Sequence, residues 1–123
     1  MRALVVDDST AMRKILGKIL KEVGFEVLEA AHGLDALQLL REVEHPELAL
    51  VDWNMPEMNG YDFVRMIRTR SDFDSMRVMM VTTESELEQM QQALDAGADE
   101  YVMKPFTKEV IQEKLELLGV GGG

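Results

Sequence analysis

The sequence of 123 residues contains no cysteine. A chain without cysteine can form neither a disulfide framework nor a thiolate zinc site, so a small secreted scaffold held by disulfides is excluded. The absence is typical of proteins of the reducing cytoplasm, and we expect a cytoplasmic location.

Long apolar runs are absent as well. No run approaches the roughly 20 residues that a bilayer-spanning helix requires. The first residues also lack the basic segment and apolar core of an export signal. We therefore expect a soluble protein that is neither membrane-bound nor exported.

Basic residues are few. Lysine and arginine together number 13 against 23 aspartates and glutamates, which gives a formal net charge of -10. Duplex binding requires a surface that neutralises phosphates, so direct binding of nucleic acid is not expected. One helical stretch nevertheless carries a basic face formed by Arg13, Lys14, Lys18 and Lys21. We interpret this face as solvated, with docking of an acidic partner as the alternative.

The hydrophobic content of 46% is enough for the core of one domain. Apolar runs of strand length alternate with stretches of helical period. The predicted strands are 3–6, 27–30, 48–51, 78–81 and 101–103, and the predicted helices are 9–23, 34–43, 61–70, 86–96 and a last one capped by Thr107. Such alternation predicts an α/β fold whose parallel sheet is covered on both faces. We assign residues 1–118 to this domain and 119–123 to a disordered Gly-rich tail.

Polar side chains follow four of the predicted strands where each strand ends. They are Asp7 and Asp8, Asp52, Thr82 and Thr83, and Lys104. Ligands of open α/β sheets bind beyond the carboxyl ends of the strands, so these residues can converge there. Any one of them could simply cap the following helix, but capping does not explain all four strand ends together.

The electrostatics of such a pocket indicate what it binds. Two carboxylates about 4 Å apart repel by roughly 4 kcal/mol at an effective dielectric of 20, and Lys104 alone cannot balance three of them. An oxygen-only site with few protein ligands suits Mg²⁺, whereas the residue pattern of a calcium loop is missing. Carboxylates, a divalent cation, a hydroxyl and an ammonium group together can handle a phosphoryl group, with a carboxylate as acceptor.

Four motifs then carry a resemblance to a known family. "VVDDS", "VDWNMPEMNG", "MVTTE" and "YVMKPF" each follow the expected strand, and together they resemble the response-regulator receiver domain over essentially the whole chain. Within that family the chain is most similar to the stand-alone chemotaxis regulators. The resemblance implies a flavodoxin-like (βα)5 doubly wound sheet with strand order 2-1-3-4-5.

The resemblance also implies roles for individual residues. Asp52 would accept a phosphoryl group, assisted by Lys104 and Thr82, while Thr82 and Tyr101 would form the switch. Magnesium would be held directly by Asp8, Asp52 and the backbone carbonyl of Asn54, and by Asp7 largely through water. The peptide bond between Lys104 and Pro105 would be cis.

Partners follow from the same resemblance. The phosphoryl donor would be a histidine kinase or a phosphotransfer domain, and a phosphatase could remove the group. A protein target would bind the phosphorylated form on the face formed by residues 85–118. We expect a monomer that is not an enzyme, although it assists its own phosphorylation and dephosphorylation.

Several alternatives share parts of this pattern. A phosphorelay intermediate or a phosphate sink would use the same pocket. An aspartate-nucleophile phosphohydrolase is disfavoured, because its D-x-D pattern is missing and the chain has no spare length for a cap. A flavin or nucleotide binder is disfavoured because both glycine-rich phosphate loops are absent.

Overall fold

The computed structural model describes residues 1–42, 45–55, 57–83, 88 and 90–120. Strands and helices alternate through these residues. The strands are β1 (Arg2–Val6), β2 (Glu26–Ala30), β3 (Leu48–Asp52), β4 (Arg77–Thr82) and β5 (Glu100–Met103). The helices are α1 (Thr10–Val23), α2 (Gly33–Glu42), α3 (Gly60–Arg68), α4 (Met90–Ala96) and α5 (Lys108–Leu118), with a 3-10 turn η1 (Ser71–Phe73). None of the helices in this described part is both long and apolar enough to cross a bilayer.

The strands form one sheet in the order β2-β1-β3-β4-β5, and every neighbouring pair is parallel. This confirms the predicted α/β class and the strand order that the resemblance implied. The first crossover runs outward to β2 and the next returns past β1 to β3, so the winding direction changes between β1 and β3. The carboxyl ends of these two strands therefore flank the place where such sheets bind ligands.

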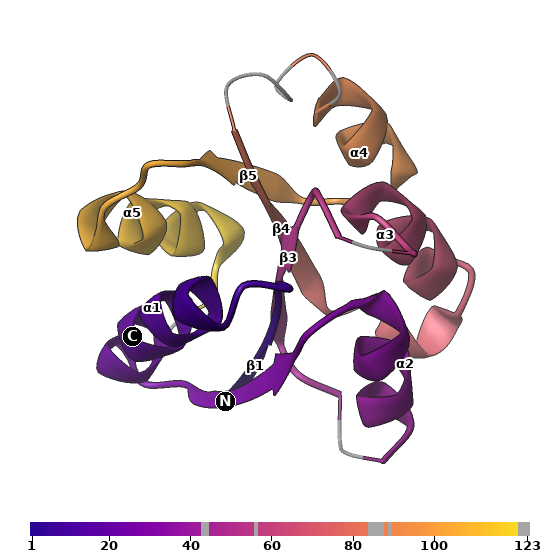
Figure 1. The fold of residues 1–123 in the computed structure, drawn as a ribbon, viewed down its shortest axis with the longest axis horizontal. Helices are drawn as coiled ribbons and strands as arrows, with labels where there is room; N and C mark the ends of the chain where they lie inside the picture. The colour runs from indigo at the N-terminus through magenta and orange to yellow at the C-terminus, as the bar shows by residue number, and fades with distance from the viewer. Residues whose placement is uncertain (43–44, 56, 84–87, 89, 121–123) are drawn as a thin grey trace.

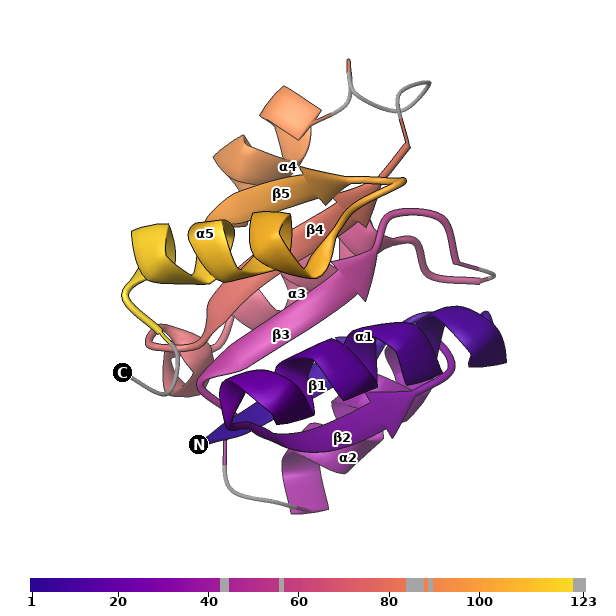
Figure 2. The same ribbon diagram turned by 90° about the vertical axis from the view of Figure 1, so that its left-hand side faces the viewer.

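Helices cover both faces of the sheet. Figure 1 shows the sheet nearly edge-on, with α1 and α5 on one side and α2, α3 and α4 on the other. In Figure 2 the same molecule is turned so that α1 and α5 lie in front of the strands. The predicted two-sided cover is therefore confirmed.

The two faces explain why the strand sequences are continuously apolar. Successive strand residues point to opposite faces, so Leu4 and Val6 join the core beneath α2, α3 and α4, whereas Ala3 and Val5 join the core beneath α1 and α5. The central strand β3 is buried at every position. A half-exposed strand would instead have alternated between apolar and polar residues.

Helix ends follow local signals that were visible in the sequence. The Ser9 side chain accepts from the Met12 N–H and the Thr107 side chain accepts from the Val110 N–H, as N-caps do. Gly24 ends α1 in the left-handed conformation, at φ 116°. Gly97 follows α4 with φ 125°. The predicted ends of these helices at residues 23 and 96 and the cap at Thr107 are confirmed.

The boundaries of the third helix were predicted wrongly. It ends at Arg68 and not at residue 70. The Thr69 hydroxyl donates to the Met66 carbonyl (2.6 Å), and the Arg70 N–H bonds to Ile67 in a tighter turn that leads into η1. Serine and threonine hydroxyls compete with helical bonding in this way.

Two other predictions lie partly outside the described residues. The fourth helix is described from Met90, while 86, 87 and 89 of its predicted range lie outside. Gly119 caps α5 and Val120 packs against the core beneath α1 and α5, whereas 121–123 are outside. The domain boundary at 118 and the disorder of the tail therefore stay predictions.

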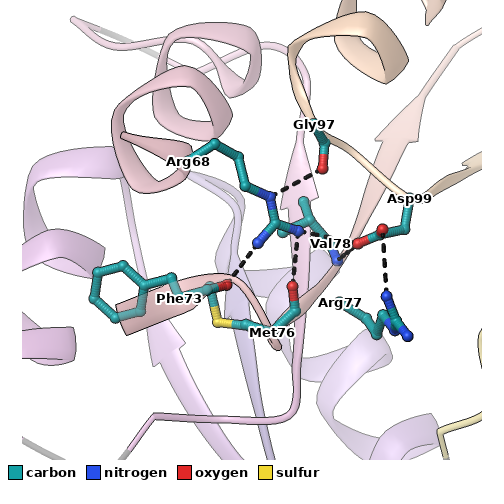
Figure 3. A network of polar contacts seen from close by, with 7 residues as sticks. All are labelled: Arg68, Phe73, Met76, Arg77, Val78, Gly97 and Asp99. Atoms are coloured by element: carbon teal, nitrogen blue, oxygen red, sulfur yellow. Dashed lines mark hydrogen bonds and ion pairs between the residues drawn. The ribbon is translucent and has the colours of Figure 1, made fainter. Parts of the chain in front are cut away.

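Polar contacts at the amino-terminal end of the sheet centre on Arg68 (Figure 3). Its guanidinium donates to the carbonyls of Phe73 (2.6 Å), Met76 (2.7 Å) and Gly97 (3.0 Å) and to the Asp99 carboxylate (3.0 Å). The same carboxylate accepts the Val78 N–H at 2.8 Å. One side chain thus ties the end of α3 to η1 and to the segments that precede β4 and β5.

Candidate functional site

The carboxyl ends of the strands bring the predicted site residues together. Asp52 is the last residue of β3 and is only 5% exposed. Asp7 follows β1 and is 1% exposed, and its N–H donates to the carbonyl of Ala30, the last residue of β2 (3.1 Å). Because β1 and β3 pair in parallel, with Val6 opposite Val51, the two aspartates emerge side by side.

Lys104 reaches this pair from the other side. Its Nζ lies 3.3 Å from Asp52 Oδ1 and 3.9 Å from Asp7 Oδ2. The Lys104 N–H donates to the Thr82 carbonyl at 2.6 Å, which continues the β4–β5 pairing into the loop. The bond from Lys104 to Pro105 is cis, as the resemblance implied.

Asp7 has one satisfied and one unsatisfied oxygen. Oδ1 accepts the Ser9 N–H at 2.8 Å. Oδ2 is fully buried and has no hydrogen-bond partner among the described residues. A buried charged oxygen without a partner is costly and indicates that a cation or ordered water belongs beside it.

Asp8 completes an acidic cluster with these two residues. One carboxylate oxygen from each of Asp7, Asp8 and Asp52 lies within 4.8 Å of the others. Two members are buried and Asp8 is exposed, so the cluster opens to solvent on one side. An oxygen cluster of this kind suits Mg²⁺, which keeps several waters and binds few protein ligands.

The charge balance of the cluster is visible in its pKa values. Burial, and then repulsion from Asp7, raise the pKa of Asp52 to about 6, although Lys104 acts to lower it. Burial raises the pKa of Asp7, against the opposing effects of the Ser9 N–H and the Lys104 charge. One lysine therefore does not compensate for the buried carboxylates, and a divalent cation would.

The predicted switch residues lie on β4 and β5, the two strands that follow β3 in the sheet. Thr82 ends β4, is fully buried, and its hydroxyl donates to the Thr83 carbonyl at 3.3 Å. Tyr101 lies on β5 opposite Met80 and is half-buried against the core beneath α2, α3 and α4. Their roles in switching and that of the Asn54 carbonyl in metal binding stay predictions.

Arg13 supports the site in a way that the sequence analysis missed. Its Nη1 donates to the backbone carbonyl of Asp7 (2.6 Å), and its Nε lies 3.4 Å from Glu29 Oε1. Its side chain is 16% exposed, so interpreting Arg13 as part of a solvated basic face was wrong. Arg13 lies in the first turns of α1 and is therefore near the loop between β1 and α1. Its position in the sequence does not show which way its side chain points.

The acidic cluster at the carboxyl edge of a 2-1-3-4-5 parallel sheet, with a lysine on a cis-proline loop, defines a class of protein. Residues 3–116 match the response regulator receiver domain, and the chain belongs to that family. It is therefore a phosphorylation-controlled switch of two-component signalling.

Individual relatives sharpen the assignment. The chain is 46% identical to a chemotaxis protein CheY homolog of Campylobacter jejuni, with 100% of this chain and 96% of the relative covered. It is 44% identical to chemotaxis protein CheY1 of Helicobacter pylori, with 96% of each covered. The solved structure of Vibrio cholerae CheY4 superposes with a TM-score of 0.86 at 33% identity, over 94% of this chain and 96% of that one.

Proposed function

We propose that Asp52 is the residue that accepts the phosphoryl group. The observation that carries this proposal is the placement of a buried carboxylate at the end of the central strand, 3.3 Å from the Lys104 ammonium and clustered with Asp7 and Asp8. In the reaction, an Asp52 oxygen forms a bond to phosphorus while the P–N bond of a phosphohistidine breaks. The electron pair of that bond and a proton go to the leaving imidazole.

The surrounding residues divide the remaining tasks. Asp7, Asp8, Asp52 and the Asn54 backbone carbonyl would hold Mg²⁺, which when bound neutralises phosphoryl oxygens. Lys104 would turn from Asp52 to a phosphoryl oxygen, and Thr82 would donate its hydroxyl to another. Because these groups stabilise charge on the moving phosphoryl group, the domain would assist both its own phosphorylation and its dephosphorylation.

The output would be altered protein binding. We assign the donor to a histidine kinase or phosphotransfer domain, and the target surface to the described part of the face formed by residues 85–118. A phosphatase would reset the switch. Similar proteins are named as chemotaxis proteins, which supports a role as a regulator of chemotaxis, and we propose that this protein acts as a cytoplasmic monomer. A phosphorelay intermediate or a phosphate sink would use the same site.

Phosphorylation with a small donor tests the acceptor directly. Incubation with acetyl phosphate and Mg²⁺ should add one phosphoryl group, measured by intact-protein mass spectrometry. Asp52→Asn should remove that addition, because an amide oxygen is a far poorer nucleophile than a carboxylate. The matched control Asp62→Asn changes an exposed aspartate in the first turn of α3 and should be modified like the wild type. Equal modification of Asp52→Asn would refute the assignment.

A further inference from the structure

The aromatic ring of Tyr101 is held by two charged side chains that the proposed mechanism does not use. The Lys114 ammonium lies 4.9 Å from the centre of the Tyr101 ring. The same ammonium lies 3.1 Å from Glu100 Oε1, and that oxygen also accepts the Tyr101 N–H at 2.9 Å. We call Glu100, Tyr101 and Lys114 the Tyr101 clamp.

The clamp joins the two faces of the sheet at its edge. Tyr101 packs against the core beneath α2, α3 and α4, whereas Lys114 belongs to α5 on the opposite face. β5 is an edge strand, so the lysine side chain can reach the ring around that edge. The side chains of Lys114 and Glu100 are 26% and 20% exposed, so their charges are partly removed from solvent.

These contacts restrict the ring more than packing alone would. An ammonium over an aromatic face is attracted to it, and the attraction is lost when the ring turns away. Glu100 strengthens the restraint, because its carboxylate bonds both the ammonium and the backbone of the tyrosine. Lys108, six residues earlier on α5, pairs instead with Glu22 of α1 at 2.8 Å. The clamp is therefore a property of Lys114 and not of lysines on this helix in general.

We propose that Lys114 is a positioning residue that holds Tyr101 in its described orientation and so sets the threshold of the switch. This inference rests on the proposed function and on the switch expected from the resemblance, in which Tyr101 would move when Thr82 is drawn to the phosphoryl group. With Tyr101 in this orientation, the Thr82 hydroxyl donates to the Thr83 carbonyl. Phosphorylation must then turn this hydroxyl and overcome the clamp before the ring can move.

The strength of this restraint on the Tyr101 ring can be measured as a change in rotamer population. A cation–π contact at a partly exposed site corresponds to a population change of about two- to fivefold. Removing the ammonium should raise the population of the other Tyr101 rotamer by that factor in the unphosphorylated protein. The phosphorylation-dependent gain in partner affinity should fall correspondingly, because the starting state is already partly switched.

The test is a measurement of the Tyr101 χ1 populations from three-bond N–Cγ and C′–Cγ couplings in the isotope-labelled full chain without Mg²⁺. Lys114→Met keeps the aliphatic stem and removes the charge, and it should raise the second rotamer two- to fivefold. Glu100→Gln keeps an acceptor for the Tyr101 N–H and should give a smaller change in the same direction. Lys108→Met is the matched control and should leave the couplings unchanged.

Identical couplings in Lys114→Met, Glu100→Gln and Lys108→Met would overturn the proposal. Repeating the measurement with Mg²⁺ and beryllofluoride, a phosphoryl mimic, separates it from the proposed function. Rotamers that respond to Lys114→Met but not to beryllofluoride would support the clamp and refute the switching role of Tyr101. Rotamers that respond to beryllofluoride equally in all variants, from equal starting populations, would refute the clamp and leave the proposed function standing.

Discussion

Burying the charged side chains of Asp7 and Asp52 costs free energy of folding, and the function of the site explains why the chain has them there. Asp7 and Asp52 are almost completely buried, and the nearest cation is one Lys104 ammonium at 3.3 Å from Asp52. A domain selected for stability alone would place apolar residues here, because buried charges are expensive unless fully paired. The cluster is instead suited to receive a divalent cation and a phosphoryl group together.

This cost predicts a pH dependence of stability in the metal-free protein. The pKa of Asp52 is raised from 3.8 to about 6, so between these values the folded protein keeps a proton that the unfolded chain has lost. The contribution of Asp52 to the free energy of unfolding must then fall as pH rises through this window and stay constant above it. Asp52→Asn should be more stable than wild type at pH 8, by roughly 3 kcal/mol.

Urea denaturation in EDTA between pH 4 and pH 8 measures this difference. The stability gap between Asp52→Asn and wild type should widen up to about pH 6, where Asp52 is half ionised, and then level off. Carboxylates that do not interact with Asp52 titrate equally in both proteins and cancel, whereas Asp7, which repels Asp52, contributes to the same gap. A gap that is the same at every pH would show that the pKa of Asp52 is not raised by folding.

Trp53 should report metal binding at the neighbouring carboxylate. It follows Asp52 directly and is 8% exposed. Its backbone N–H donates to the Val81 carbonyl at 2.9 Å, so Trp53 is held beside the site. Mg²⁺ should bind weakly and change Trp53 fluorescence, since the charge of Asp52 becomes neutralised. Asp52→Asn should weaken the response at equal Mg²⁺. An unchanged signal across the wild-type titration would count against this site.

The sequence alone predicted that the acidic residues, Thr82 and Lys104 belong to the site. Each follows an apolar run, and the carboxyl ends of parallel strands meet at one edge of the sheet. It could not find the contact of Arg13 with the Asp7 carbonyl, because side-chain direction depends on packing around the finished loop. The contact between Lys114 and Tyr101 was equally hidden, since it joins two elements across an edge of the sheet.

At the scale of elements, local signals in the sequence predicted most of the strand and helix boundaries. The strands were predicted to within one residue at each end because both faces bury them. The first helix was predicted from its apolar period and the last from its cap at Thr107. The strand order came from resemblance, since pairing depends on contacts between distant segments. The early end of α3 was missed because it follows from a side-chain hydrogen bond and the turn of η1.

Arg68 shows how one side chain can determine the arrangement of several elements. It donates to the carbonyls of three residues that follow α3 and to the Asp99 carboxylate, and its side chain is only 16% exposed (Figure 3). Arg68→Met should lower the free energy of unfolding by about 3 kcal/mol, because it leaves partly buried carbonyls and a carboxylate without their donor. Thermal or urea unfolding followed by circular dichroism measures the loss.

Arg65 provides the matched control on the same helix. It is exposed, and its guanidinium lies 5.6 Å from the centre of the Tyr61 ring. Arg65→Met should therefore cost less than about 1 kcal/mol. Similar losses for the two variants would mean that the Arg68 contacts are not the reason for its effect.

At the scale of the whole molecule, the site connects to the proposed target surface through the pairing of β4 with β5. β4 ends in Thr82 at the site, and β5 carries Tyr101 opposite Met80 and leads through Lys104 to α5. A phosphoryl group can change partner binding only by stabilising one arrangement of this region over another. A tenfold change in affinity requires about 1.4 kcal/mol, which one hydrogen bond from a hydroxyl to a charged group can provide.

Thr82→Ala should separate phosphorylation from output. The variant keeps Asp52 and its acidic cluster, so acetyl phosphate should still modify it, but most of the affinity gain of the phosphorylated form for its target should be lost. Calorimetry with the target protein, with and without phosphorylation, measures the gain. The matched control Thr107→Ser keeps the hydroxyl that caps α5 and should retain the full gain. If Thr82→Ala also retains it, or if amide exchange maps the target to α1 alone, the route from Asp52 through Thr82 and Tyr101 to the 85–118 face is wrong.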